Sequence, residues 1–190
     1  MQQWRRGKGE RGNMAHLEKG LIEIYTGPAK GKSTASFGLA LRASGHGYQV
    51  RIVQFMKAGN YGENRAFEKL APDVQIASYG RKCFLDPDNP HEEDIALAHE
   101  ALKKAEQWML SEDTDIMILD EINNALFFKL LTIEEVLAFV DQKPKHVELV
   151  MTGRNAPEEL QARADYVTEM REIKHPYTTS GQGSRKGIEF

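Results

Sequence analysis

A glycine-rich segment with two lysines stands between an apolar run and a helix-like pattern near the start of the chain. Its residues are Gly27, Pro28, Ala29, Lys30, Gly31, Lys32, Ser33 and Thr34. Glycines let several backbone N–H groups turn toward one anion, and the N-terminus of the following helix adds positive potential there. Lys32 adds a full charge, and a hydroxyl directly after such a lysine commonly binds the magnesium ion of a nucleotide. The segment therefore predicts a polyphosphate site, with Lys32 as a catalytic residue, Ser33 as a magnesium ligand and Thr34 as the alternative ligand.

This loop is one residue shorter than the usual phosphate-loop pattern, because Thr26 stands where the first glycine would be and Gly27 follows it. A chance turn rich in Gly, Lys and Ser is the alternative explanation. The strand pattern before the loop, the helix pattern after it and a second acidic motif favour nucleotide binding.

The second motif is an apolar run, residues 116–119, that ends in Asp120 and Glu121. A carboxylate at the end of a buried strand beside a phosphate loop can hold magnesium directly or through water. Asp120 and Glu121 are therefore candidate metal ligands with Ser33. Asp120 as a simple helix cap is the alternative. Glu121 is also a candidate catalytic residue, because in a hydrolase or kinase it would position water or accept a proton. The residues alone therefore leave several classes of phosphate-loop enzyme open.

Short β-branched runs alternate with longer helical patterns over residues 20–190, which is typical of βαβ units. Strands are expected at residues 21–26, 50–55, 74–79, 115–119, 146–151 and 166–170. Helices are expected from Ser33 to Gly45, over residues 64–70, from an N-cap at Asn89 to Met109, and after an N-cap at Thr132 that has Glu135 as its capping-box partner. The fold class predicted is α/β, a RecA-like P-loop fold with a mostly parallel sheet of about six strands flanked by helices.

Composition narrows the class of protein. The 190 residues are 41% hydrophobic and 28% charged with a net charge of −3, which is ordinary for a globular protein and does not indicate a nucleic-acid partner. No apolar run is long enough for a membrane span or a secretion signal, so a cytoplasmic location is expected. The single cysteine, Cys83, excludes a disulfide within the chain.

Residues 1–19 are basic and glycine-rich. We therefore divide the chain into an N-terminal segment, residues 1–19, and a domain, residues 20–190.

Several further motifs, in order, resemble the P-loop corrinoid adenosyltransferases of the CobA/CobO/BtuR type, from about Gly20 to Phe190. Besides the two motifs above, the resemblance rests on residues 25–27, 45–47, 53–57, 152–154, 164–170, 174–177 and 187–190. It implies an enzyme that moves the 5′-deoxyadenosyl group of ATP to the Co(I) centre of cob(I)alamin or another corrinoid and releases triphosphate. Co(I) is itself the nucleophile, so no side-chain nucleophile is required. The alternatives kept open are a P-loop ATPase or small-molecule kinase and a non-catalytic nucleotide sensor.

The resemblance also assigns expected partners and residues. It implies ATP with Mg²⁺, the triphosphate on residues 27–34, magnesium on Ser33 and Glu121 with Asp120 beside it, a reductase for the cobalt, and a homodimer. An aromatic pair in the loop after the third strand helps to remove the lower axial ligand in such enzymes. This chain has Phe84 as a partial match, and an ordinary surface loop is the alternative. Arg154 is expected to reach phosphate or a corrinoid amide, or else to form a structural ion pair. Residues 1–19 correspond to a cover over the active site, or else to a simple tail.

Overall fold

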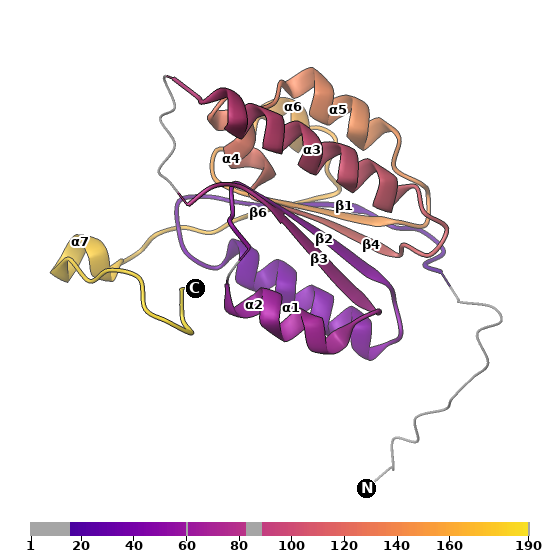
Figure 1. The fold of residues 1–190 in the computed structure, drawn as a ribbon, viewed down its shortest axis with the longest axis horizontal. Helices are drawn as coiled ribbons and strands as arrows, with labels where there is room; N and C mark the ends of the chain where they lie inside the picture. The colour runs from indigo at the N-terminus through magenta and orange to yellow at the C-terminus, as the bar shows by residue number, and fades with distance from the viewer. Residues whose placement is uncertain (1–15, 60, 83–88, 190) are drawn as a thin grey trace, which may run out of the picture.

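The strands form a wholly parallel sheet within the part of the chain that the computed structural model describes, residues 16–59, 61–82 and 89–189. The strands are β1 (Ile22–Thr26), β2 (Val50–Phe55), β3 (Val74–Tyr79), β4 (Ile116–Asp120), β5 (Glu148–Thr152) and β6 (Tyr166–Glu169). Their spatial order is β3-β2-β4-β5-β1-β6 (Figure 1), and each neighbouring pair is parallel. The carboxyl ends of the strands therefore meet at one edge. The predicted α/β class is confirmed, and the sheet is entirely rather than mostly parallel.

Helices cover both faces of this sheet (Figure 1). On one face lie α1 (Lys32–Gly45) and α2 (Gly62–Phe67), which continues into a 3₁₀ turn, η1 (Glu68–Leu70). On the other face lie α3 (Glu92–Met109), α4 (Ile122–Phe127), α5 (Ile133–Asp141) and α6 (Glu158–Gln161). This layering explains why the central strands are apolar on both sides, since neither face of β2 or β4 meets water.

Strand β2 shows how the sequence fills the two layers. All six of its residues are buried. Val50 and Ile52 pack in the core under α1 and α2, whereas Val53 and Phe55 pack in the larger core under α3, α4 and α5. Because successive side chains of a strand point to opposite faces, this one strand contributes side chains to both cores and so packs against both layers of helices.

The two predicted helix starts have different outcomes. Thr132 caps α5 and forms a capping box with Glu135, as predicted. The predicted cap of α3 is wrong, because α3 begins at Glu92 with His91 as its N-cap, and not after Asn89. The His91 ring accepts a hydrogen bond from the Glu93 N–H, 3.2 Å away. Local sequence offered an equally plausible Asn-Pro start.

After β6 the chain leaves the sheet, forms α7 (Pro176–Ser180) away from the body of the molecule, and turns back toward the start of α1 (Figure 1). None of the helices in the described ranges combines the length and the apolar character needed to cross a membrane.

Candidate phosphate-binding site

The phosphate loop joins β1 to α1 at the edge where the strands end. Gly27 and Gly31 have φ angles of 97° and 124°, which side-chain-bearing residues rarely adopt. They also lack room for a side chain. A Cβ at Gly27 would lie 2.5 Å from the Met170 carbonyl oxygen, and one at Gly31 would lie 2.9 Å from the Met170 sulfur. The Ala29 N–H donates to the same Met170 carbonyl at 3.1 Å. Met170, directly after β6, thus supports the loop from behind.

Helix α1 presents its positive end to this loop. Its N-cap is Gly31, no side chain caps it, and its first turn carries no acidic residue, so its first N–H groups are free of a competing carboxylate. The buried Lys32 ammonium donates to the carbonyls of Gly27 (2.8 Å) and Ala29 (2.6 Å). Burial lowers the pKa of Lys32, while the Glu121 carboxylate acts in the opposite direction. The loop therefore holds a lysine charge at its centre.

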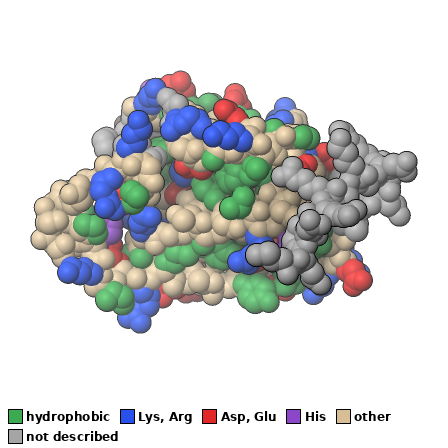
Figure 2. Space-filling model, turned by 90° about the horizontal axis from the view of Figure 1, so that it is seen from below, with side chains coloured by type: hydrophobic (Ala, Val, Ile, Leu, Met, Phe, Trp, Pro, Cys, Tyr) green, Lys and Arg blue, Asp and Glu red, His purple; other side chains and the backbone are tan. Residues whose placement is uncertain are grey.

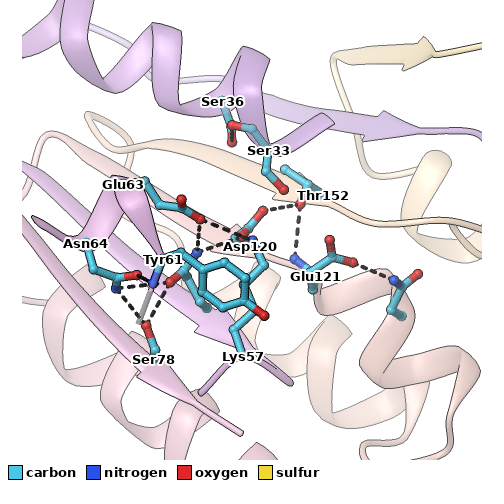
Figure 3. Close-up of polar contacts among 12 residues, drawn as sticks. Ser33, Ser36, Lys57, Tyr61, Glu63, Asn64, Ser78, Asp120, Glu121 and Thr152 are labelled. Atoms are coloured by element: carbon cyan, nitrogen blue, oxygen red, sulfur yellow. Dashed lines mark hydrogen bonds and ion pairs between the residues drawn. The ribbon is translucent and has the colours of Figure 1, made fainter. Parts of the chain in front are cut away.

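Asp120, at the end of β4, is fully buried and its two carboxylate oxygens already accept hydrogen bonds (Figure 3). Oδ1 accepts from the Thr152 hydroxyl at 2.8 Å. Oδ2 accepts from the Lys57 ammonium at 2.7 Å and the Gln54 amide at 3.1 Å. A buried charge needs this degree of pairing. Asp120 therefore connects the ends of β2, β4 and β5, and its carboxylate lies behind the pocket wall.

Glu121 is the more accessible acid of the pair. It adopts a left-handed conformation with φ 69° as the N-cap of α4, and its N–H donates to the Thr152 hydroxyl at 3.0 Å. Its carboxylate accepts from the Asn124 amide. Burial, and then the Asp120 charge, raise the pKa of Glu121, whereas Lys57, Lys32 and Arg154 oppose that rise. The bend at Glu121 turns one acid into the sheet and the next toward the phosphate loop.

Lys57 forms a second wall of the site, opposite the phosphate loop. Met56, with φ 60°, turns the chain after β2. The Lys57 ammonium then lies 5.7 Å from the centre of the Phe37 ring, 5.4 Å from that of Tyr61 and 3.6 Å from the Glu63 carboxylate. Burial lowers the pKa of Lys57, but the carboxylates of Asp120, Glu121 and Glu63 together more than offset this, so the net pKa is raised. This side chain is a fixed cation.

A polar network holds that wall in place (Figure 3). The Gln54 side-chain oxygen accepts from Ser78 Oγ at 2.7 Å and from the Asn64 amide at 3.3 Å, and its amide reaches Glu63 at 3.3 Å. Because the Gln54 side chain is fully buried, these contacts satisfy groups that would otherwise destabilise the core.

These elements enclose a hollow of about 810 Å³. Its lining includes the predicted residues Ala29, Lys30, Gly31, Lys32, Ser33, Thr34, Glu121 and Arg154. Of the other predicted residues, Gly27, Pro28 and Asp120 do not belong to the lining, and Phe84 lies outside the described residues. The structure thus brings most of the predicted site into one pocket.

The lining also contains residues to which sequence reasoning gave no role. They are Phe37, Lys57, Tyr61, Gly62, Glu63, Asn124, Ser184, Gly187, Ile188 and Glu189. One signal could have identified Lys57, because it follows the carboxyl end of a parallel strand, where ligands of α/β sheets bind. Of the residues from the far end of the chain, Gly187, Ile188 and Glu189 lie in the motif at 187–190 on which the family resemblance rests, although that motif was given no role in the site.

A glycine loop that wraps the N-terminus of a helix, facing an acidic pair at the end of a nearby parallel strand, defines a P-loop nucleotide-binding α/β protein. A family model described as "ATP:corrinoid adenosyltransferase BtuR/CobO/CobP" matches residues 18–190. The chain belongs to this family of enzymes, which transfer the adenosyl group of ATP to a corrinoid.

Individual relatives agree with the family model. The chain is 42% identical to a corrinoid adenosyltransferase of Sinorhizobium sp, over 91% of this chain and 81% of the relative. It is 37% identical to a corrinoid adenosyltransferase of Pseudomonas aeruginosa, over 93% and 86% of the two chains. It is 33% identical to the corrinoid adenosyltransferase of Escherichia coli K12, over 93% and 88%.

Proposed function

We propose that the pocket beside the phosphate loop binds ATP and that the chain transfers its 5′-deoxyadenosyl group to the Co(I) centre of a corrinoid such as cob(I)alamin. The observation that carries this proposal is the buried Lys32 at the uncapped N-terminus of α1, at one end of a large hollow. A helix end and a lysine suit a polyphosphate. The rest of the hollow leaves room for the nucleoside and for the approach of a second substrate.

The reaction itself makes few demands on side chains. The electron pair of Co(I) attacks the ribose C5′ atom, the bond between C5′ and the phosphate oxygen breaks, and triphosphate leaves with the bonding electrons. No proton is removed from the nucleophile, so a general base is unnecessary. The protein must align cobalt with C5′ and stabilise the charge on the leaving triphosphate. Lys30, Lys32 and the loop amides are suited to that second task.

The residues present fit a magnesium ion that accompanies the nucleotide. Ser33 and Glu121 both line the pocket, and in the described ranges no three His, Cys, Asp or Glu side chains form a metal-binding group by themselves. One hydroxyl and one carboxylate are enough for Mg²⁺, because this ion commonly binds one or two protein oxygens and completes its coordination with phosphates and waters. We propose Ser33 and Glu121 as the ligands. Asp120 lies beside them and accepts hydrogen bonds from Thr152 and Lys57. The ion supplies charge neutralisation on the triphosphate.

The direct test combines the protein with ATP, magnesium and chemically reduced cobalamin under anaerobic conditions. We expect a light-sensitive alkylcobalamin and an equal amount of intact triphosphate, measured by absorbance before and after illumination and by anion chromatography. ADP and orthophosphate without alkylated corrinoid would assign the chain to the ATPase or kinase class. ATP that binds but survives with every reduced corrinoid would indicate a nucleotide sensor.

The basic N-terminal segment is proposed to cover the corrinoid in the active site of a second copy. Residues 1–15 lie outside the described residues, but the chain that follows them begins at the opposite edge of the sheet from the pocket. There the His16 ring lies 2.8 Å from the Asp115 carboxylate and the Gly20 N–H donates to the Lys145 carbonyl. Because the segment joins the domain on the side of the sheet away from its own pocket, we propose that it covers the pocket of a partner subunit.

Deletion of residues 1–15, which keeps the His16 contact, is expected to leave ATP affinity unchanged, because the residues assigned to phosphate begin at Gly27. Corrinoid affinity or turnover should fall, since the site loses its shield from water. The measurement is steady-state kinetics with corrinoid as the varied substrate, carried out in parallel on the truncated and the full-length protein. Unchanged kinetic constants would show that the segment is only a tail.

Three further features are proposed. A homodimer is supported by β6, an edge strand whose four residues are all exposed, including Tyr166 and Val167, because such an edge favours pairing or covering by another surface. A separate reductase is supported by the chemistry, since ATP cannot reduce cobalt to Co(I). Cytoplasmic location is supported by the need for ATP as a substrate.

A further inference from the structure

The C-terminal segment starts and finishes at the phosphate loop. Met170, at its start, packs against Gly27 and Gly31. The chain then runs outward through α7, returns, and lines the phosphate pocket with Ser184, Gly187, Ile188 and Glu189 (Figure 1). Figure 2 shows Lys and Arg side chains gathered at the left of the face seen from below, on the side of the molecule where α7 lies. Residues from opposite ends of the sequence therefore share one pocket.

An ion pair lies where the returning segment meets the loop. Arg185 Nη2 donates to Glu189 Oε1 at 2.9 Å, Arg185 Nε donates to Oε2 at 3.3 Å, and the Arg185 N–H donates to Oε2 at 2.8 Å. These hydrogen bonds from Arg185, together with the charge of Lys30, lower the pKa of Glu189 to about 2. Glu189 is therefore an anion near a lysine of the phosphate loop.

The two side chains occupy different positions relative to the pocket. Glu189 lines both the phosphate pocket and a smaller hollow, whereas Arg185 lines only the smaller one. In this conformation Glu189 reaches the lining of the phosphate pocket, and Arg185, paired with it, does not. A triphosphate in the loop would repel that carboxylate, and the planar guanidinium binds phosphate oxygens with the same paired geometry as carboxylate oxygens.

We propose that Arg185 is a phosphate-binding residue and that Glu189 is its internal competitor. When triphosphate occupies the loop, the Glu189 carboxylate is displaced, and Arg185 exchanges its carboxylate partner for a phosphate oxygen. The segment of residues 184–189 then becomes the outer wall of the occupied site. This inference rests on the proposed phosphate site but not on the transfer of the adenosyl group.

The test measures binding of inorganic tripolyphosphate to the full chain by isothermal titration calorimetry, with magnesium and without corrinoid. The variants are Glu189→Gln, Arg185→Gln and the double variant. Lys186→Gln is the matched control, because Lys186 is a neighbouring exposed cation that does not line the pocket. Melting curves verify that each variant is folded.

Glu189→Gln is expected to bind tripolyphosphate about 3-fold more tightly, because a like charge is gone. The decisive comparison is between the double variant and Glu189→Gln, since neither contains the competing carboxylate. The double variant is expected to bind about 10-fold more weakly, the effect of losing one hydrogen-bonded charge. Lys186→Gln should stay within about 2-fold of the wild type, as expected for an exposed charge outside the pocket.

A double variant that binds as tightly as Glu189→Gln would overturn the proposal, because Arg185 would then act only on Glu189. If adenosyl transfer is normal in that case, the proposed function stands and only this inference fails. A wild-type chain that does not bind tripolyphosphate would overturn both this inference and the phosphate site on which it rests.

Discussion

Lys32→Ala is expected to lower the turnover number of adenosyl transfer by about 10²-fold or more, the usual cost of removing a charge that stabilises a leaving group. The Lys32 ammonium lies at the centre of the phosphate loop, bound to the carbonyls of Gly27 and Ala29, and is the buried cation of that loop. The measurement is the steady-state rate with saturating ATP, magnesium and reduced cobalamin.

Lys103→Ala is the matched control, since Lys103 is an exposed lysine of α3 that does not line the pocket, and its rate should equal that of the wild type. A melting curve tests whether Lys32→Ala remains folded. A folded Lys32→Ala variant with the wild-type rate would show that the triphosphate does not lie on this loop.

Glu121→Gln is expected to raise the magnesium concentration needed for half-maximal activity by roughly 10-fold or more, because it removes a charged oxygen ligand while keeping the shape of the side chain. A second readout is the binding of Mn²⁺ in the presence of ATP, followed by electron paramagnetic resonance, which does not depend on turnover. The affinity for Mn²⁺ should fall in parallel with the magnesium requirement.

Two comparisons make this result specific. Glu134→Gln, at an exposed position in the first turn of α5, should leave both measurements unchanged. Asp120→Asn should weaken Mn²⁺ binding less than Glu121→Gln, because both Asp120 oxygens already accept hydrogen bonds from Thr152, Lys57 and Gln54. The reverse order of effects would make Asp120 the direct ligand and would contradict the assignment of Glu121.

The start of α3 shows where sequence patterns are weakest. Asn89 followed by Pro90 is a good local helix start, yet the helix begins at Glu92. Arg81 pairs with Asp94 in the first turn of α3 and lies 3.3 Å from the Glu93 carboxylate. These contacts join the end of β3 to the helix across a loop, and no helix-capping rule includes them. Helix existence follows from periodicity, whereas a helix boundary also depends on contacts between elements.

By itself, the sequence determined the strand, loop and helix around Lys32, the acidic pair at the end of β4 and the α/β class, because each depends on residues close together in the chain. The family resemblance implied that Glu121 holds magnesium with Asp120 beside it, and the tertiary structure added the conformation that separates the two acids and the other walls of the pocket. Parallel pairing brings Lys57 beside Asp120, 63 positions apart, and the turn at Glu121 separates the two acids. The return of the chain after α7 adds Glu189 to a pocket built around residues 29–34. Such contacts arise from chain topology and packing, so no local spacing of residue types predicts them.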